Sequence, residues 1–262
     1  MCGRYAATFT ADDLVQQMQI ELDCTADPTR SVLVNPQDPP AGRPDWNLAP
    51  TKQAPVVLTR GDVRQLRLLT WGLVPSWAKD IKVGIRMINA RAETLLDKGA
   101  FAKAAVARRA LVPAAGWYEW QVSPTATTKA GKPRKQPFFI RRGDQGDGEP
   151  LAFAGIYEFW RDRSVADGDD PLAWLVSFSI ITTAAEEGLA RIHDRQPVVL
   201  DRDDWDEWLD PDQQDPEFVR AALAPHTPGR FEAWPVSAAV SSGRNNGPHL
   251  LDLAPVGEIL GD

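Results

Sequence analysis

The stretch RALVPAAGWYEW, residues 109–120, says most about the fold of this chain. Its first half is apolar at nearly every position, which predicts a strand that is covered on both faces. Small residues and Gly116 then predict a turn, and the aromatic residues beyond it have high β-propensity. The stretch therefore predicts a buried strand, a turn and a second strand.

Segments on both sides of this stretch have similar strand character. Residues 54–60 and 64–74 are rich in alternating and β-branched residues, as paired strands are. Further strands are expected at 137–142, 150–160, 172–185 and 231–237, and helices at 11–20, 90–109, 184–193, 202–210 and 216–223. Gly99 interrupts the longest of these helices. Many short strands with few helices predict an α+β fold, because a regular βαβ alternation would need more helices.

Three polar segments, residues 25–45, 122–136 and 161–170, are predicted to be loops inserted on one compact body. The chain has 262 residues, which is enough for a substantial core. We therefore expect a single domain over residues 1–262.

Charge is unevenly distributed along the chain. The net charge of -7 argues weakly against a nucleic-acid partner, because phosphate binding needs clustered Lys and Arg. Residues 129–142 are basic without a single acid, however, whereas residues 201–217 are strongly acidic. Steering of a charged ligand depends on such separate faces and not on the sum of charges.

Several classes of protein are not expected. No apolar run is long enough to cross a bilayer, and no charged and apolar leader suggests secretion, so we expect a bacterial cytoplasmic protein. Two cysteines build no disulfide framework. The three histidines lie far apart and no cysteine has a CxxC partner, so we expect no metal and no cofactor.

Cys2 directly follows the initiator methionine, and removal of Met1 would leave a cysteine with a free α-amine. The amine has an ordinary pKa of about 7.7–8.0 and the thiol about 8.5, so both are partly nucleophilic near neutral pH. An aldehyde would condense with the amine to a Schiff base, and the thiol would then close a thiazolidine ring. Arg4 is close enough in sequence to lower the pKa of the thiol. On position alone, a disordered cysteine without a role is the alternative.

Eight short motifs occur in a fixed order between residue 2 and about residue 240. They are MCGRYA, WNLAPTKQAPVVL, TWGLVPSWAKD, MINARAETL, RRALVPAAGWYEW, LAFAGIYEFW, FSIITTAA and IHDRQPVVL. Together they resemble the SRAP (SOS response-associated peptidase) family of HMCES-type abasic-site processing proteins. Gln196 departs from the methionine that is common at its position in the family. The resemblance implies one SRAP domain with mixed, largely antiparallel sheets, a barrel-like core and peripheral helices.

The resemblance also implies a function. SRAP proteins bind single-stranded DNA and crosslink covalently to abasic sites through the cysteine that follows Met1, which shields these sites during the DNA damage response. Carried over by motif, the catalytic residues are Cys2 in MCGR, Asn89 in INAR, Glu119 in WYEW and His193 in IHDR. Self-processing of Met1, weak AP-lyase activity and reversal of the crosslink by Glu119 are further expectations.

Each of these side chains suits a chemical task. The amide of Asn89 can hold the Cys2 amine or the sugar oxygens. Glu119 lies between Trp117 and Trp120, where partial burial should raise its pKa and let it transfer protons near neutral pH. His193 titrates near neutral pH and could protonate the sugar oxygen as the ring opens to the aldehyde. Taken singly, an ordinary strand glutamate and a helix-terminal histidine are the alternative interpretation.

The same motifs contain candidates for DNA contacts. Arg4, Arg91 and Arg195 are expected to bind phosphates, because the guanidinium fork matches phosphate oxygens. Trp71 and Trp120 are expected to stack on bases. Thr182 and Thr183 could also donate to phosphates, and Trp77 is expected to be the core tryptophan in place of Trp71. We expect a monomer whose partner is single-stranded DNA with abasic sites.

Two other classes of function stay open on the sequence. One is a peptidase that acts beyond its own Met1, although no substrate-binding signature accompanies Cys2 and His193. The other is a non-covalent reader of modified bases, which would work without Cys2.

Overall fold

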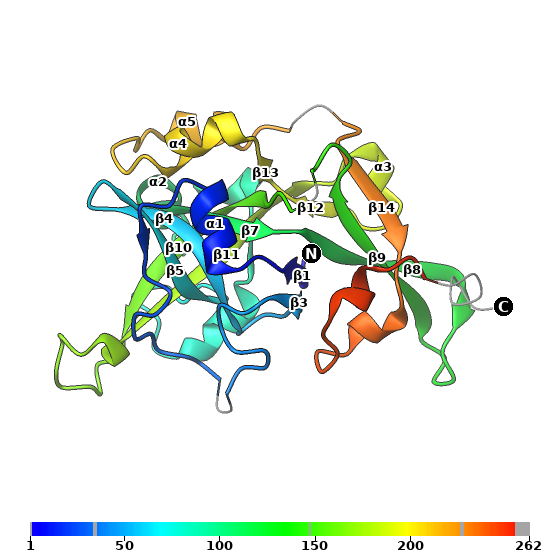
Figure 1. Ribbon diagram of the computed structural model, residues 1–262, viewed down its shortest axis with the longest axis horizontal. Helices are drawn as coiled ribbons and strands as arrows, with labels where there is room; N and C mark the ends of the chain where they lie inside the picture. The colour runs from blue at the N-terminus through cyan, green and yellow to red at the C-terminus, as the bar shows by residue number, and fades with distance from the viewer. Residues whose placement is uncertain (1, 34–35, 147, 226–227, 255–262) are drawn as a thin grey trace.

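Two β-sheets and several short helices make up residues 2–33, 36–146, 148–225 and 228–254, which are the residues that the computed structural model describes (Figure 1). The strands are β1 (Tyr5–Ala7), β2 (Leu22–Asp23), β3 (Asp45–Leu48), β4 (Gln53–Arg60), β5 (Val63–Trp71), β6 (Asn89–Arg91), β7 (Arg109–Ala114), β8 (Gly116–Thr127), β9 (Pro133–Arg142), β10 (Leu151–Arg161), β11 (Trp174–Ala184), β12 (Arg195–Pro197), β13 (Val199–Leu200) and β14 (Phe231–Pro235). The α-helices are α1 (Ala11–Gln17), α2 (Ala102–Ala107), α3 (Glu187–Ala190), α4 (Trp205–Leu209) and α5 (Pro216–Ala222). Short 3₁₀ turns are η1 (Ile81–Arg86), η2 (Ala92–Thr94), η3 (Pro171–Ala173), η4 (Arg202–Asp204), η5 (Ala238–Ser241) and η6 (Pro248–Leu251).

The larger sheet closes on itself as a five-stranded barrel. Its strands follow the order β11, β10, β7, β4 and β5, and β5 then pairs in parallel with β11 through Thr70 opposite Ser177 and Trp71 opposite Phe178. The other pairs of the barrel are antiparallel. The predicted α+β class, with mixed and largely antiparallel sheets and a barrel-like core, is confirmed.

The smaller sheet lies beside the barrel, to the right in Figure 1, with the strand order β14, β9, β8, β1 and β3. The N-terminal strand β1 is antiparallel to β8, with Tyr5 opposite Trp117 and Ala6 opposite Gly116. β1 is therefore an inner strand of this sheet, with β8 on one side and β3 on the other.

The stretch at residues 109–120 links the two sheets. Its first strand, β7, pairs with β10 and β4 in the barrel, whereas its second strand, β8, pairs with β1 and β9. The predicted strands are confirmed, but the chain passes from one sheet to the other between them and does not fold back. Gly116 is required there, because a Cβ would lie 2.4 Å from the Ile140 carbonyl oxygen.

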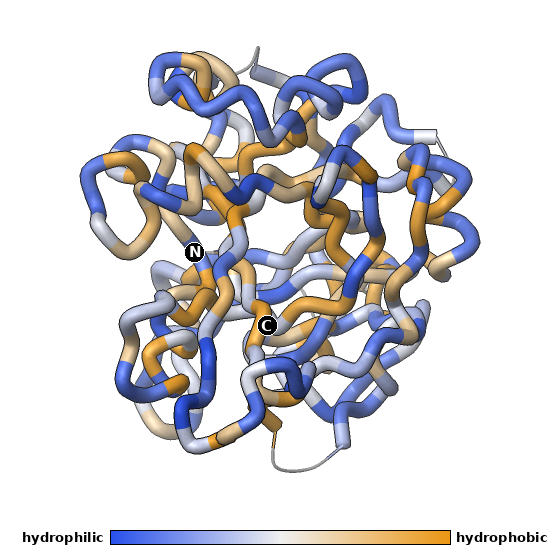
Figure 2. The backbone as a smooth tube through the Cα atoms, turned by 90° about the vertical axis from the view of Figure 1, so that its left-hand side faces the viewer, coloured by the Kyte–Doolittle hydropathy of each residue, from blue (hydrophilic) through white to orange (hydrophobic). Residues whose placement is uncertain are grey.

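Aromatic side chains fill the core between the sheets. The Tyr5 and Trp71 rings meet edge to face with centroids 5.2 Å apart, and Trp71 stacks on Phe178. The backbone tube of Figure 2 shows apolar segments running through the interior with polar segments around them. Truncating a fully buried tryptophan such as Trp71 to alanine typically costs about 3–5 kcal/mol.

Two local predictions are wrong. Residues 90–109 do not form one long helix: Asn89–Arg91 is a strand parallel to β11, and within 90–109 only Ala102–Ala107 is α-helical. Pairing with β11 overrides the helix propensity of this segment. The polar hairpin loop expected at 122–136 is present as a hairpin, but most of it is strand and not loop, because β8 continues to Thr127 and β9 begins at Pro133.

Other local predictions are confirmed. The helix expected at 11–20 is present as α1, and the Thr10 side chain caps it in a reciprocal capping box with Asp13. The strands expected at 54–60 and 64–74 pair with each other as β4 and β5.

No helix among the described residues is long and apolar enough to span a membrane, and no group of their His, Cys, Asp and Glu side chains could hold a metal ion.

Candidate functional site

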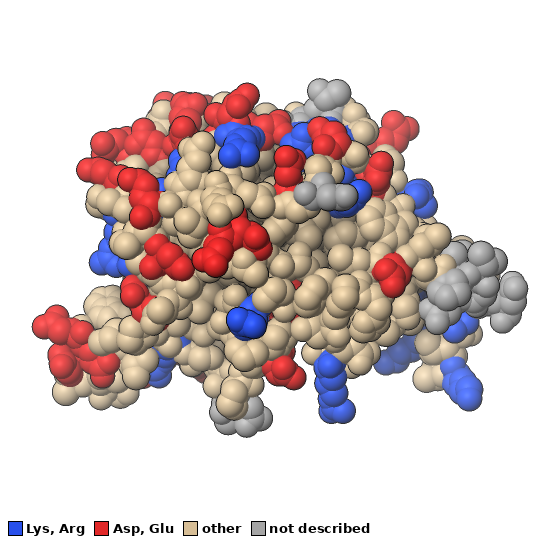
Figure 3. All heavy atoms as spheres, in the orientation of Figure 1, with Lys and Arg blue, Asp and Glu red and all other residues tan. Residues whose placement is uncertain are grey.

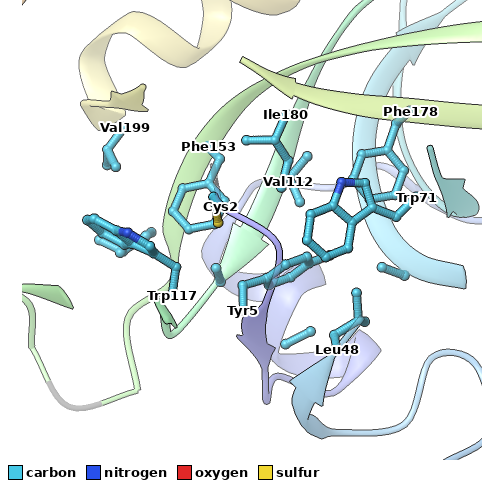
Figure 4. Packing of buried hydrophobic residues seen from close by; sticks show 14 of the residues in the cluster. Cys2, Tyr5, Leu48, Trp71, Val112, Trp117, Phe153, Phe178, Ile180 and Val199 are labelled. Carbon is cyan, nitrogen blue, oxygen red and sulfur yellow. The ribbon is translucent and has the colours of Figure 1, made fainter. Parts of the chain in front are cut away.

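Cys2 lies inside the protein at the seam between the two sheets. Its side chain is fully buried in the cluster that contains Tyr5, Trp117 and Phe153, as Figure 4 shows. The Cys2 Sγ lies 3.8 Å from the Arg4 carbonyl oxygen, which also accepts a hydrogen bond of 3.0 Å from the Tyr118 amide. The pairing of β1 with β8 therefore continues toward Cys2 and brings it alongside Glu119.

Asn89 ties Cys2 to the barrel. Its Nδ2 donates a hydrogen bond of 2.8 Å to the Cys2 carbonyl oxygen, and its backbone lies opposite Ile180 in the parallel pair of β6 and β11. The Asn89 Oδ1 is buried and has no hydrogen-bond partner among the described residues. The amide thus offers one acceptor next to the residue that would carry the reactive amine.

Glu119 is a buried acid on β8, with only 2% of its surface exposed. Burial, together with the negative charge of Asp194, raises the pKa of Glu119 to about 7. The prediction that its surroundings raise this pKa is confirmed. Near neutral pH both protonation states of this carboxyl are populated, which is the condition for passing protons in either direction.

His193 faces Glu119 from the loop between α3 and β12. Its Nε2 lies 3.9 Å from the Glu119 Oε2, and its Nδ1 accepts a hydrogen bond of 3.0 Å from the Arg195 amide. The same Nδ1 lies 3.0 Å from the Asp194 Oδ1, while Nε2 faces the Glu119 carboxyl. Burial lowers the pKa of His193. Both pKa values shift toward the neutral forms, so burial disfavours a fully charged pair of Glu119 and His193 near neutral pH.

The Cys2 thiol differs from the sequence-based expectation. Burial raises its pKa well above the ordinary value, and the negative charge of Glu119 acts in the same direction. The Arg4 guanidinium is not among the causes of this shift, because it donates to the Asn47 Oδ1 at 2.8 Å and approaches the Val240 carbonyl oxygen; only the contact of the thiol with the Arg4 backbone acts to lower the pKa. The thiol is therefore protonated near neutral pH and needs a base before it can act as a nucleophile.

These contacts bring four distant segments to one place. An amide, a carboxyl and an imidazole surround the N-terminal cysteine, with proton-transfer groups poised near neutral pH. Such a site is equipped for nucleophilic addition to an electrophilic carbon with proton transfer on both sides of the step.

Comparisons with known proteins identify the family. The family model of the SOS response associated peptidase (SRAP) matches residues 1–243. The chain belongs to this family. It is 35% identical over 254 residues to the abasic site processing protein YoqW of Bacillus subtilis, covering 96% of this chain and 99% of YoqW. It is 33% identical over 252 residues to the abasic site processing protein YedK of Escherichia coli, covering 96% of this chain and 99% of YedK.

Solved structures share the fold. A crystal structure of a protein from Bacteroides thetaiotaomicron superposes with a TM-score of 0.75 at 21% identity, covering 97% of this chain and all of that chain. A phage-related protein from Bordetella bronchiseptica superposes with a TM-score of 0.61 at 28% identity, covering 90% of this chain and 94% of that chain.

Three of the DNA contacts predicted for this SRAP protein are corrected by burial. Trp71 is fully buried, its ring faces core aromatics, and its Nε1 donates to the Ile88 carbonyl oxygen at 2.9 Å. Its ring has no face open to a base. Thr182 is 1% exposed and its Oγ1 contacts the Ala90 carbonyl oxygen, so this hydroxyl is not available to phosphate. Thr183 is buried as well.

Two further candidates have partners inside the protein. The Arg195 guanidinium forms a forked pair with Glu93 at 2.7 and 2.9 Å and donates to the Thr182 carbonyl oxygen. The half-buried Trp120 donates to Ser241. Arg4 and Arg195 are therefore engaged in positioning the segments around the site, and Arg91 is the exposed arginine of the predicted three.

Trp77 is the tryptophan that the sequence misassigned. It was expected in the core, but 67% of its surface is exposed. It lies between β5 and η1, in the excursion that returns to Asn89. Pro75, Ser76 and charged residues flank it, and this polar context is the signal that indicates an exposed loop. Trp77 and not Trp71 has a ring that a base could stack on.

The loop that carries His193 has its own support. The Gln196 side chain, which departs from the family pattern, accepts a hydrogen bond of 2.9 Å from the Glu186 amide. Gln121 of β8 donates to the Arg191 carbonyl oxygen at 3.0 Å. These bonds hold both sides of the loop and explain why glutamine is compatible with the position of His193.

Proposed function

We propose that this protein processes abasic sites in single-stranded DNA by forming a covalent thiazolidine crosslink through Cys2 after Met1 has been removed. The relatives YoqW and YedK bear the name abasic site processing protein. The observation that carries the proposal is the meeting of Cys2 with Asn89, Glu119 and His193 at one seam. The open-chain abasic sugar is an aldehyde, which is the electrophile that an N-terminal cysteine captures.

The first step is formation of a Schiff base. The Cys2 α-amine adds to the aldehyde carbon, a C–N bond forms, and the resulting hydroxyl leaves as water. Glu119 in its protonated form can supply the proton that the departing hydroxyl needs. The buried Asn89 Oδ1 can accept a hydrogen bond from the amine and orient its lone pair.

The second step closes the ring. The Cys2 Sγ adds to the imine carbon, the C–S bond forms, and the thiol proton passes to the nitrogen. The ionised form of Glu119 can take that proton, which compensates for the raised pKa of the buried thiol. The protonated fraction of His193 can donate a proton to the sugar ring oxygen as the closed form of the sugar opens, and its lowered pKa makes it a stronger acid. Overall one water is released and no oxidant or metal is consumed.

The surface around the site supports a nucleic-acid partner. Trp77 is exposed for stacking and Arg91 for a phosphate contact. Acidic side chains crowd the left of Figure 3, whereas Lys and Arg side chains project along the centre and right of its lower edge. We infer that DNA approaches away from the acidic face, which reconciles DNA binding with the net charge of -7.

Further activities belong to the same proposal. Hydrolysis of the Met1–Cys2 peptide bond would expose the amine, and Met1 itself lies outside the described residues. A Schiff base on the abasic sugar acidifies the neighbouring carbon, so β-elimination of the phosphate is a weak side reaction. The reverse of ring closure uses the same Glu119 carboxyl.

The test is a crosslinking assay on denaturing gels. Protein whose mass confirms that it begins at Cys2 is mixed with a single-stranded oligonucleotide that carries one abasic site. We expect an adduct that resists denaturation, and its complete loss in Cys2→Ala.

Cys24→Ala is the matched control, since Cys24 is the other free thiol and is also buried. This variant should form the adduct like the wild type. Absence of any adduct from protein that begins at Cys2 would contradict the proposal. An adduct that survives Cys2→Ala would assign the chemistry to another nucleophile. Tight binding without an adduct would favour a non-covalent reader.

A further inference from the structure

The hairpin of β8 and β9 extends away from the reactive site and forms a cationic arm. We use this name for residues 121–136, which follow Trp120 on β8 and return on β9. Figure 1 shows this hairpin at the lower right, beyond the smaller sheet. Since Glu119 sits at the base of the same strand, whatever the arm binds is held in a fixed relation to the reactive site.

Four cations project from the arm. Lys129, Lys132, Arg134 and Lys135 are all exposed, and no Asp or Glu occurs between Gln121 and Gly143. Within the described residues, none of the four belongs to an ion pair. The arm is therefore a concentration of uncompensated positive charge on an acidic protein.

The cations at the base of the hairpin behave differently. Arg142 pairs with Asp144 at 2.7 Å and with Asp201 at 2.6 Å, and Arg141 lies over the Trp234 ring. These two arginines serve the packing of the smaller sheet. The arginines at the base of the hairpin thus have partners within the protein, whereas the cations at its tip have no ion-pair partner among the described residues.

The arm is built as a defined element and not as a loose loop. The Ser123 side chain is buried and accepts from the Ala126 amide at 2.9 Å, and the Thr128 amide donates to the Lys132 carbonyl oxygen at 2.7 Å across the tip. Gly131 takes the left-handed conformation, with φ of +74°, that this turn requires. A preorganised ribbon loses less entropy when it binds than a disordered tail does.

The arm has the reach to contact DNA outside the reactive nucleotide. From Glu119 to Thr127 the strand makes eight steps of about 3.3 Å, at most about 26 Å. This distance spans several nucleotides of a DNA strand. Lys135 also lies close enough to His193 for its positive charge to add to the lowering of the His193 pKa that burial causes.

We propose that the cationic arm binds the phosphate backbone on one side of the abasic nucleotide, and so extends the DNA footprint beyond the reactive pocket. This inference rests on the proposed function and adds to it a second, non-covalent contact region. The contacts are with phosphates, so they are independent of base sequence and depend on salt.

The test removes three charges that lie away from the reactive site, in the variant Lys129→Gln, Lys132→Gln and Arg134→Gln. Binding to a single-stranded oligonucleotide with a tetrahydrofuran analogue, which has no aldehyde, is measured between 0.1 and 1 M salt. The slope of log affinity against log salt should fall by about 2, since each lost phosphate contact accounts for about 0.7 on single strands. This corresponds to about a hundredfold loss at 0.1 M salt that disappears near 1 M.

The matched control carries the same charge change elsewhere, as Arg60→Gln, Lys98→Gln and Lys103→Gln, which are exposed cations outside the arm. Its slope should stay within about 0.5 of the wild type. Equal losses in both variants would mean that only net charge matters and would overturn the proposal, as would an unchanged slope in the arm variant.

Oligonucleotide length provides a second readout. Shortening the DNA from one end toward the abasic analogue should weaken wild-type binding more than shortening it from the other, and the arm variant should lose this asymmetry. Symmetric behaviour of the wild type would contradict the proposal. The crosslinking gel with Cys2→Ala tests the chemistry separately, so an adduct without an arm effect would overturn the arm alone.

Discussion

Two regions of the protein each bury a strand glutamate, and they differ in the group that faces it. In the Glu119 region the neighbours are His193 and Cys2, and the pKa of the carboxyl rises to about 7. In the Glu158 region, on β10, the Arg108 guanidinium binds the carboxylate at 2.7 Å. Glu119 is 2% exposed and Glu158 is 8% exposed, so burial alone does not separate them.

The difference shows what makes a buried carboxyl reactive. A cation compensates the charge of Glu158, so this glutamate serves to connect the strand end to Arg108. For Glu119 the desolvation caused by burial is the dominant influence, and it raises the pKa of the carboxyl to about 7. The raised pKa of Glu119, set against the direct Arg108 pair of Glu158, is thus the feature that separates the candidate catalytic glutamate from the structural one.

The largest expected difference is in the rate of crosslinking. Glu119→Gln should slow adduct formation by about 10² to 10⁴-fold, because the amide cannot transfer protons. Glu158→Gln should leave the rate within about threefold of the wild type. Single-turnover time courses on denaturing gels with excess protein measure both. Similar rates for the two variants would remove the distinction between the two regions.

The second difference concerns the free energy of unfolding. At pH 8, Glu119→Gln should increase it and Glu158→Gln should decrease it. The native pKa of Glu119 lies above its ordinary value of about 4.5, so the folded state binds the proton more tightly and loses stability as the pH rises toward 7. Glu119→Gln removes this cost and should stabilise the fold by about 2–3 kcal/mol at pH 8, with little effect below pH 4.5. Glu158→Gln should destabilise by about 2 kcal/mol, because Arg108 loses its partner.

Urea unfolding at pH 4.5 and pH 8 measures these free energies. The lowered pKa of His193 acts in the opposite direction on the wild-type curve, so each variant is compared with the wild type at the same pH. Destabilisation by Glu119→Gln at pH 8 would mean that hydrogen bonds of the carboxylate outweigh its desolvation.

The smallest expected effect comes from removing the Arg108 guanidinium, so that the buried Glu158 carboxyl loses the cation that faces it. Arg108→Gln leaves the carboxyl of Glu158 buried without a cation, and protonation then relieves the cost. The variant should lose about 1–2 kcal/mol more stability at pH 8 than at pH 5 relative to the wild type. The same unfolding series detects it, and a loss that does not depend on pH would show that Arg108 acts through packing alone.

Much of the fold follows from local pattern. The strands at 54–60 and 64–74, the helix at the capped Thr10 and the raised pKa of Glu119 were all predictable, because each depends on neighbouring residues. The helix expected at 90–109 was not realised, since pairing of Asn89–Arg91 with β11 depends on a segment ninety residues away. Long-range pairing of this kind leaves no periodic signal in the shorter segment.

By itself the sequence determined the family, because the order and spacing of the motifs do not depend on whether each helix or strand is predicted correctly. It also determined the candidate residues for the chemistry, which are Cys2, Asn89, Glu119 and His193. The tertiary structure decided the burial, the charged neighbours and the pKa of each side chain. It buries the Cys2 thiol and raises its pKa, covers Trp71, exposes Trp77 and pairs Arg195 with Glu93. The physical reason is that exposure and charge compensation depend on which sheet covers a strand and which distant side chain faces it.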